Sequence, residues 1–93
     1  MEFEWDDVKA AKNVAKHGIS FKQAVFIFDG CYVTISCRVV NGEIRQKVIG
    51  DVEGFGVTIV IATSRDGRIR IISARRANKK ERDFYYEHNK TIA

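Results

Sequence analysis

The chain has 93 residues, of which 45% are hydrophobic and 30% charged, and its formal net charge is +4. This composition is typical of one small globular domain over residues 1–93, and it excludes disordered and collagen-like chains. No apolar run approaches the ~20 residues of a membrane span, and the acidic start does not resemble a signal peptide. Cys31 and Cys37 lie too far apart on one expected strand to form a disulfide, so we expect a cytoplasmic protein with reduced thiols.

The first thirty residues are expected to form a short strand and two helices. Residues 3–5 form the strand, and a helix over 8–16 follows, capped by Asp6 or Asp7 and ended by Gly18. The apolar residues at helical spacing in that helix are Val8, Ala11, Val14 and Ala15. Ser20 and Gln23 form a capping-box pattern for a second helix over 21–28, which Asp29-Gly30 ends.

Four strands joined by tight turns are expected next, over residues 31–40, 44–50, 55–63 and 68–75. Asn41-Gly42 is a strong hairpin signal, and the third strand is apolar enough to be central. Regular alternation puts Val33, Ile35, Cys37 and Val39 on one face of the first strand. In the last strand, the same rule puts Arg68, Arg70 and Ile72 on one face and Ser73 and Arg75 on the other.

A last helix is expected from residue 79 to residue 88 or 89. Asn78 and Glu81 form its capping box, and Phe84 and Tyr85 mark the face that docks on the sheet. The chain is therefore predicted to be an α+β protein with a short N-terminal strand, two helices, an antiparallel four-strand meander and a C-terminal helix packed on the sheet. We expect helices to cover one face of that sheet.

The positive charge is concentrated in residues 65–82, which carry eight basic and two acidic side chains, a net charge of +6. The basic residues are Arg65, Arg68, Arg70, Arg75, Arg76, Lys79, Lys80 and Arg82. Arginine predominates, and its planar fork matches phosphate oxygens. This pattern favours a surface that binds a nucleic-acid backbone, and a merely solubilising face is the alternative.

Two arginines are candidates for a phosphate site. Arg70 shares its face with an apolar residue and is expected at the core edge, where it either binds phosphate or pairs with Glu53 or Asp51. Arg75 precedes the N-terminus of the last helix, whose free N–H groups also attract anions. An ordinary charged loop is the alternative there.

Three residues are candidates for proton transfer. Glu81 is either only a helix cap or a carboxylate that works beside Arg75 or Arg82. Tyr85 either stacks on a base or belongs to the core, and His17 is either an acid–base group or an ordinary end of a helix. The sequence has no phosphate-binding glycine loop and no metal-binding pattern, so we expect no cofactor and no metal. RNA cleavage needs neither, because the substrate's own 2′-OH can attack the adjacent phosphate.

Two long motifs resemble those of the BrnT family of toxins. The first runs from Phe3-Glu4-Trp5-Asp6 through Lys16-His17-Gly18-Ile19-Ser20-Phe21, and the second runs from Arg68 to Ala77 with Glu81, Arg82 and Tyr85. The resemblance implies a fold similar to RelE-like ribonuclease toxins and the toxin role in a type II toxin–antitoxin pair. It also implies a partner similar to BrnA, a ribbon-helix-helix antitoxin. On this resemblance, the toxin would bind operator DNA only when it is in complex with the antitoxin.

These observations together predict an endoribonuclease that inhibits growth by cleaving RNA. The expected catalytic residues are Arg70, Arg75, His17, Glu81 and Tyr85. The residues expected to hold the nucleic acid are Lys16, Arg45, Arg68, Arg76, Lys79, Lys80 and Arg82. The alternatives are a nucleic-acid-binding module without catalysis, or an inactive toxin that acts with its antitoxin in regulating their operon.

Overall fold

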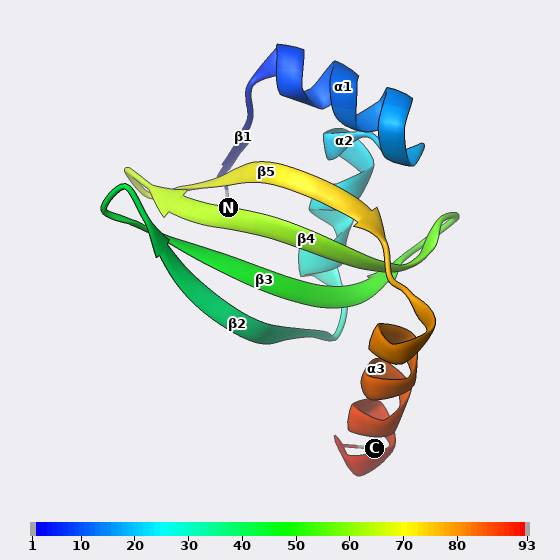
Figure 1. The fold of residues 1–93 in the computed structure, drawn as a ribbon. Coiled ribbons are helices and arrows are strands. Elements are labelled where there is room, and N and C mark those ends of the chain that lie inside the picture. Colours follow the sequence, from blue (N-terminus) through cyan, green and yellow to red (C-terminus); the bar gives the residue numbers. More distant parts are fainter. Residues whose placement is uncertain (1, 93) are drawn as a thin grey trace.

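The expected elements are present, in the expected order, in the computed structural model, which describes residues 2–92 and the side chains of residues 2–89. They are β1 (Glu2–Glu4), α1 (Asp7–His17), α2 (Phe21–Ala24), the 3-10 helix η1 (Val25–Asp29), β2 (Tyr32–Val40), β3 (Glu43–Val52), β4 (Gly56–Arg65), β5 (Arg68–Arg76) and α3 (Lys79–Ile92). The five strands form one sheet in the order β1-β5-β4-β3-β2 (Figure 1). β1 pairs parallel to β5, while β2 to β5 form the antiparallel meander with β4 at its centre. The predicted α+β architecture is confirmed, and no helix among residues 2–92 has the length and apolar character to cross a membrane.

The caps of the N-terminal helices are confirmed, and α1 docks on the sheet through a polar residue rather than through the apolar residues at helical spacing. Asp6 caps α1, and Gly18 ends it in the left-handed conformation. Val8 is 64% exposed, whereas Asn13 is buried. The Asn13 amide donates to the carbonyls of Ile19 and Ala74 and accepts from the Ala74 N–H. The helix therefore docks through a buried amide that satisfies backbone groups, which apolar periodicity does not reveal.

The main core lies between the sheet and the N-terminal helices. Its buried members include Phe21 and Ile27 from the helical segments and Val48, Val60 and Ile71 from the strands. The capping box of Ser20 and Gln23 starts the second helix as predicted, but the helix tightens to 3-10 geometry from residue 25 onward. Figure 1 shows α2 and η1 behind the strands, on the face away from the viewer.

Two β-bulges change which side chains share the opposite face of the sheet, called the open face below. In β2, Thr34 pairs with Val48 and Ser36 with Lys47, so the strand carries one extra residue. Ser36 and Arg38 therefore join Val33 on the open face, and the prediction that Ile35, Cys37 and Val39 share a face with Val33 is wrong. The reason is that a bulge reverses the alternation of a strand.

The bulge in β5 changes which arginines share the open face. Ser73 pairs with Ile61 and Ile71 pairs with Ala62, which leaves Ile72 as the extra residue. Arg70 and Arg75 lie opposite Thr63 and Ile59, which are four residues apart on β4 and so share one face. The prediction that Arg70 and Arg75 lie on opposite faces is therefore wrong, because both belong to the open face.

Helix α3 covers one end of the open face. Ala77 and Tyr85 pack there with Ile49, Val57 and Ile59 from the sheet. Phe84, which was predicted to dock, is 46% exposed and stacks on His88 instead. Helices thus contact both faces of the sheet rather than one, and Figure 1 shows α3 leading away from the strands, so the rest of the open face is uncovered.

Candidate active site

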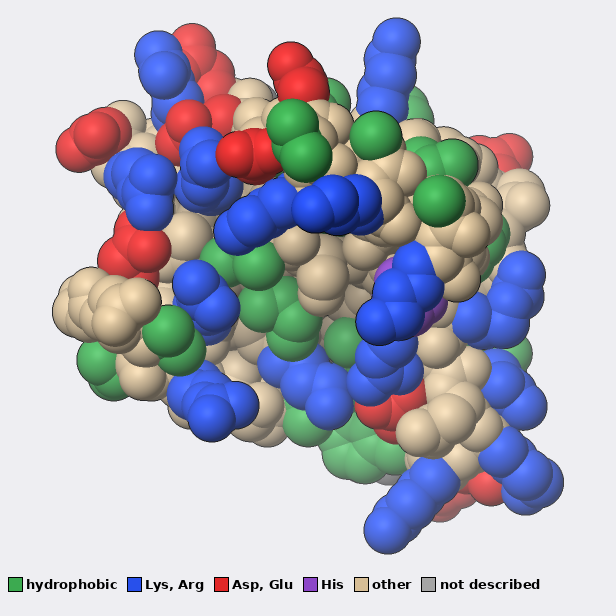
Figure 2. Space-filling model, turned by 45° about the horizontal axis from the view of Figure 1, so that its top comes forward, with side chains coloured by type: hydrophobic (Ala, Val, Ile, Leu, Met, Phe, Trp, Pro, Cys, Tyr) green, Lys and Arg blue, Asp and Glu red, His purple; other side chains and the backbone are tan. Residues whose placement is uncertain are grey.

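The uncovered part of the open face holds a cavity of about 500 Å³. It is lined from β2 to β5 by Ser36, Arg38, Val40, Arg45, Gln46, Lys47, Ile59, Ile61, Ile72, Ser73 and Arg75. Figure 2 shows Lys and Arg side chains gathered around hydrophobic ones on this side of the molecule. We call this cavity the cationic pocket; it combines an isoleucine floor with side chains suited to an anion.

Arg75 is held in the pocket by the carboxylate of Glu81. Its two terminal nitrogens donate to the two Glu81 oxygens over 2.8 and 2.9 Å. Glu81 also accepts from the Asn78 N–H at 2.8 Å, which confirms the capping box, and lies 3.6 Å from the Lys47 Nζ. Glu81 therefore fixes the start of α3 and orients two cations of the pocket at once.

The charge state of this group follows from the same contacts. The hydrogen bonds from Arg75 lower the pKa of Glu81 from 4.5 to about 2, and the Asn78 N–H adds to this effect. The hydrogen bond with Glu81 in turn raises the pKa of Arg75. Glu81 is therefore ionised and a weak base at neutral pH.

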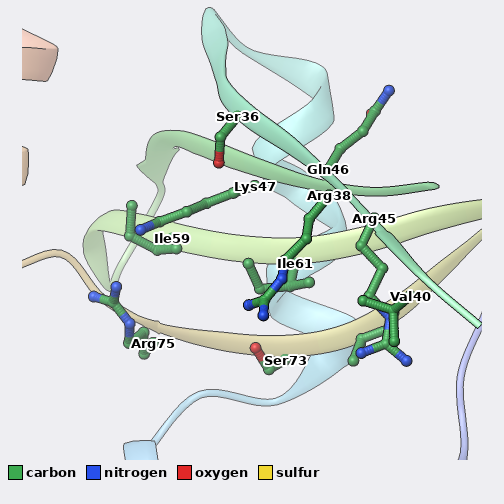
Figure 3. A pocket seen from close by; sticks show the side chains of 11 residues that line it. Ser36, Arg38, Val40, Arg45, Gln46, Lys47, Ile59, Ile61, Ser73 and Arg75 are labelled. Carbon is green, nitrogen blue, oxygen red and sulfur yellow. The ribbon is translucent and has the colours of Figure 1, made fainter.

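The hairpin of β2 and β3 supplies the other cations. Arg38 and Arg45 lie directly opposite each other across the two strands. In Figure 3, Arg38 and Lys47 reach over β4 toward β5, while Gln46 points away from the pocket. Neither Arg38 nor Arg45 forms an ion pair within the part of the chain whose side chains are described, and the Arg45 Nε–H is buried without an acceptor there.

His17 borders the pocket from the side of α1. A smaller cavity of about 230 Å³ is lined by Lys9, Lys12, Asn13, Lys16, His17, Ile72 and Ser73. Ile72 and Ser73 line both cavities, so the two cavities are adjacent at β5. His17 and Lys16, which the sequence singled out, are thus brought next to the cationic pocket.

Several other predicted residues lie outside the pocket lining because nearby groups hold them. Arg70 pairs with Glu4 at 3.4 Å, not with Asp51 or Glu53, and Arg68 pairs with Glu2. Arg76 donates to the Phe55 carbonyl and stacks on its ring. Lys79 pairs with Asp83, and Arg82 donates to the Ala77 carbonyl. Lys80 also lies outside the lining and is exposed. The +6 segment is therefore largely engaged in structural contacts and does not form one continuous cationic surface.

The tyrosine among the catalytic candidates is also in a structural position. Tyr85 is 6% exposed, and its hydroxyl donates to the Cys31 carbonyl at 2.9 Å. Cys31 itself and Cys37 are free and exposed. In the described segment 2–89, no three His, Cys, Asp or Glu side chains cluster closely enough to hold a metal ion.

Sequence reasoning did not single out Arg38 and Lys47 as site residues. A signal for both was present: a two-residue Asn-Gly turn pairs Val40 with Glu43 and hence Arg38 with Arg45, and Lys47 follows on the same face two residues later. The bulge in β2 does not disturb this register, because it lies farther from the turn. Counting outward from the hairpin would therefore have placed three cations together.

Comparison with known proteins agrees with this architecture. Residues 5–81 match the family model described as the ribonuclease toxin BrnT of a type II toxin–antitoxin system. The fold is similar to the 1.1 Å crystal structure of the Brucella abortus ribonuclease toxin BrnT, with a TM-score of 0.61 and 24% sequence identity. The similarity covers 85% of this chain and 99% of that one. The curated proteins include no match to this chain.

Proposed function

The chain belongs to the BrnT family of ribonuclease toxins of type II toxin–antitoxin systems, and we propose that its cationic pocket is the place where it cleaves RNA, without a metal ion. The observation that carries this proposal is the Arg75 guanidinium, clamped by Glu81 beside Lys47 and Ser73 on an open, apolar-floored face. The lining offers cations and hydroxyls, and these groups suit a phosphate oxygen rather than a metal ion.

In this mechanism, the 2′-OH of one nucleotide attacks the adjacent phosphorus, and the bond to the 5′-oxygen of the next nucleotide breaks. The products are a 2′,3′-cyclic phosphate and a free 5′-hydroxyl. Negative charge builds up on the phosphorane oxygens, and we assign its stabilisation to Arg75 with Lys47, which both line the pocket. One proton must leave the 2′-oxygen, and one must reach the departing 5′-oxygen.

We assign the proton transfer to His17. The Glu81 carboxylate, with its pKa of about 2, is a poor base, and the Tyr85 hydroxyl is occupied within the core. His17 is half-buried and lines the smaller cavity next to the cationic pocket, and imidazole is the side chain best suited to exchange protons near neutral pH. Lys16 beside it, with Arg45 across the pocket, is proposed to hold the flanking backbone.

The decisive experiment incubates the purified chain with a defined RNA in excess chelator, beside the same strand made entirely with 2′-deoxy sugars. We expect only the RNA to be cut, with a cyclic phosphate on the product. Arg75→Gln should lower the rate by about 10²–10³-fold and His17→Gln by about 10²-fold or more. Lys22→Gln is the matched control, because it also removes one positive charge, from an exposed site on α2.

Binding of both strands without scission, also when ribosomes are added, would instead support a nucleic-acid-binding module or an inactive toxin. Unchanged cleavage by Arg75→Gln would refute the proposed phosphate site. Both results can be interpreted only for folded variants, so each variant is first compared with the parent by thermal unfolding.

A toxin of a type II system has an antitoxin partner, and we propose that this one is a BrnA-like ribbon-helix-helix protein that covers the cationic pocket in the cytoplasm. Family membership supports this assignment. Co-expression should give a stable complex in which RNA cleavage is blocked. The complex should bind operator DNA, and the toxin alone should not. Retention of full ribonuclease activity in the complex would contradict the proposal.

A further inference from the structure

Arg38 and Arg45 form an arrangement that is unfavourable unless something negative binds to it. They are direct cross-strand neighbours on the open face, near the Asn41-Gly42 turn. Like charges in this position repel each other across an antiparallel pair. The hairpin therefore carries two guanidinium groups on one face where the sheet gains no stability from them.

The carboxylates of the neighbourhood do not relieve this charge. Glu43 is engaged by Arg65 at 2.6 Å, and Glu81 is engaged by Arg75. Among side chains 2–89, neither Arg38 nor Arg45 has an anionic partner, and the buried Nε–H of Arg45 has no acceptor. A buried donor without an acceptor is costly, and arginine without a carboxylate is a strong donor for a phosphate.

These two arginines are set apart from the Arg75 end of the pocket. Arg45 on β3 lies opposite Thr63 of β4, whereas Arg75 on β5 lies opposite Ile59 of β4. The backbones of the two arginines are therefore separated by two strand spacings, roughly 10 Å, across the sheet and by four residues, roughly 13 Å, along the strands. Figure 3 shows the guanidinium groups of Arg45 and Arg75 at opposite ends of the pocket, with Arg38 between them. The floor between these ends is formed by isoleucines.

We propose that Arg38 and Arg45 form a second phosphate subsite, which holds the phosphate next to the scissile one on the same RNA strand. The nucleoside between the two phosphates then lies over the apolar floor. This inference deepens the proposed ribonuclease function and rests on it. It names the substrate as a single-stranded segment of at least three nucleotides, because a dinucleotide has only the scissile phosphate.

The test neutralises one phosphate at a time. The substrate is a short DNA strand with one ribonucleotide at the position that the wild-type chain cuts. A neutral methylphosphonate replaces either the phosphate on the 5′ side of this ribonucleotide or the phosphate on the 3′ side of the next nucleotide, and the scissile phosphate between them is unchanged. For the wild type, one of the two replacements should lower kcat/KM by about tenfold, which is the order of effect expected for one charge-assisted contact. For the double variant Arg38→Gln/Arg45→Gln, the same replacement should have no effect.

The matched control is Lys22→Glu, which lowers the net charge by the same two units at one exposed site on α2, outside the pocket lining. It should remain as sensitive to methylphosphonate as the wild type. Equal sensitivity of the wild type and of Arg38→Gln/Arg45→Gln would overturn the subsite, and so would insensitivity of the wild type to both replacements.

A binding measurement separates this proposal from the ribonuclease function. An all-2′-deoxy strand is not cut, and its affinity should fall with salt. The log–log salt slope should be shallower by about 0.7 for Arg38→Gln/Arg45→Gln, which corresponds to one lost phosphate contact on a single strand. If the wild type cuts no RNA but this slope changes as expected, the subsite stands and the ribonuclease proposal fails. An unchanged slope refutes the subsite in either case.

Discussion

Replacing Glu81 by Gln isolates the charge of this side chain from its role as a helix cap. Glutamine also occurs at this position of a capping box, so the hydrogen bond from the Asn78 N–H can remain. What is lost is the ionic part of the two hydrogen bonds from Arg75 and of the contact with Lys47. Glu81→Ala is the companion variant, because it removes the cap as well.

The magnitude follows from the pKa of Glu81, which falls from 4.5 to about 2 on folding. A fall of this size corresponds to about 3 kcal/mol of stability at neutral pH. The Arg75 side chain is 36% exposed, so solvent screens part of the attraction, and we expect about 2 kcal/mol for Glu81→Gln. Loss of the cap should add about 1 kcal/mol in Glu81→Ala.

The pH dependence has a definite sign. A carboxyl whose folded pKa is lowered stabilises the fold above its unfolded pKa of 4.5, and this contribution is lost as the pH falls toward about 2. Urea unfolding of wild type and Glu81→Gln should therefore show the full difference at pH 7 and about half of it or less at pH 3. Equal stability of the two proteins at pH 7, or a difference that is unchanged at pH 3, would refute the reasoning.

Three further substitutions test the fold around the site. Asn13→Ala removes three buried hydrogen bonds, two to Ala74 of β5 and one to Ile19, and should lower the free energy of unfolding by about 2–3 kcal/mol in urea titrations. Gly50→Ala places a Cβ 2.7 Å from the Ile27 Cγ1, so a loss of about 1–3 kcal/mol is expected by the same measurement, and a stabilised variant would contradict the packing described. Tyr85→Phe loses the hydrogen bond to the Cys31 carbonyl and should lower the stability measured by thermal unfolding by about 1 kcal/mol. RNA cleavage by this variant should stay within twofold of wild type. A large drop in cleavage at normal stability would instead indicate that Tyr85 takes part in catalysis.

Local signals predicted most of the fold, because capping and turn chemistry depend on adjacent residues. Asp6, Ser20 and Asn78 cap helices as expected, and Asn41 and Asp66 take the left-handed conformation that their hairpin turns require. These residues act over three or four positions, so a single sequence contains the whole pattern. The order of β2 to β5 followed from the same turns, since each links neighbouring antiparallel strands, whereas no turn indicates that β1 lies beside β5.

The composition of the site was harder to predict, because it depends on the register between strands. Nothing in the run from Arg68 to Arg75 marks Ile72 as an extra residue, since isoleucine suits a regular strand equally well. Charge counting also failed to separate paired arginines from unpaired ones. Arg68 and Arg70 meet Glu2 and Glu4 only because β1 lies beside β5, a contact between residues 66 positions apart.

The extra residue in β5 also sets the phase of the chain that follows it. After Ile72, each side chain points to the face of the sheet opposite to the one that regular alternation from Arg70 predicts. This shift applies to Arg75 and to the start of α3. A deletion of this one isoleucine would keep the composition, the charge and nearly every motif of the chain. It would nevertheless turn Arg75 toward the helical side and leave the pocket without it. The number of residues between Arg70 and Arg75 therefore decides whether Arg75 lines the cationic pocket.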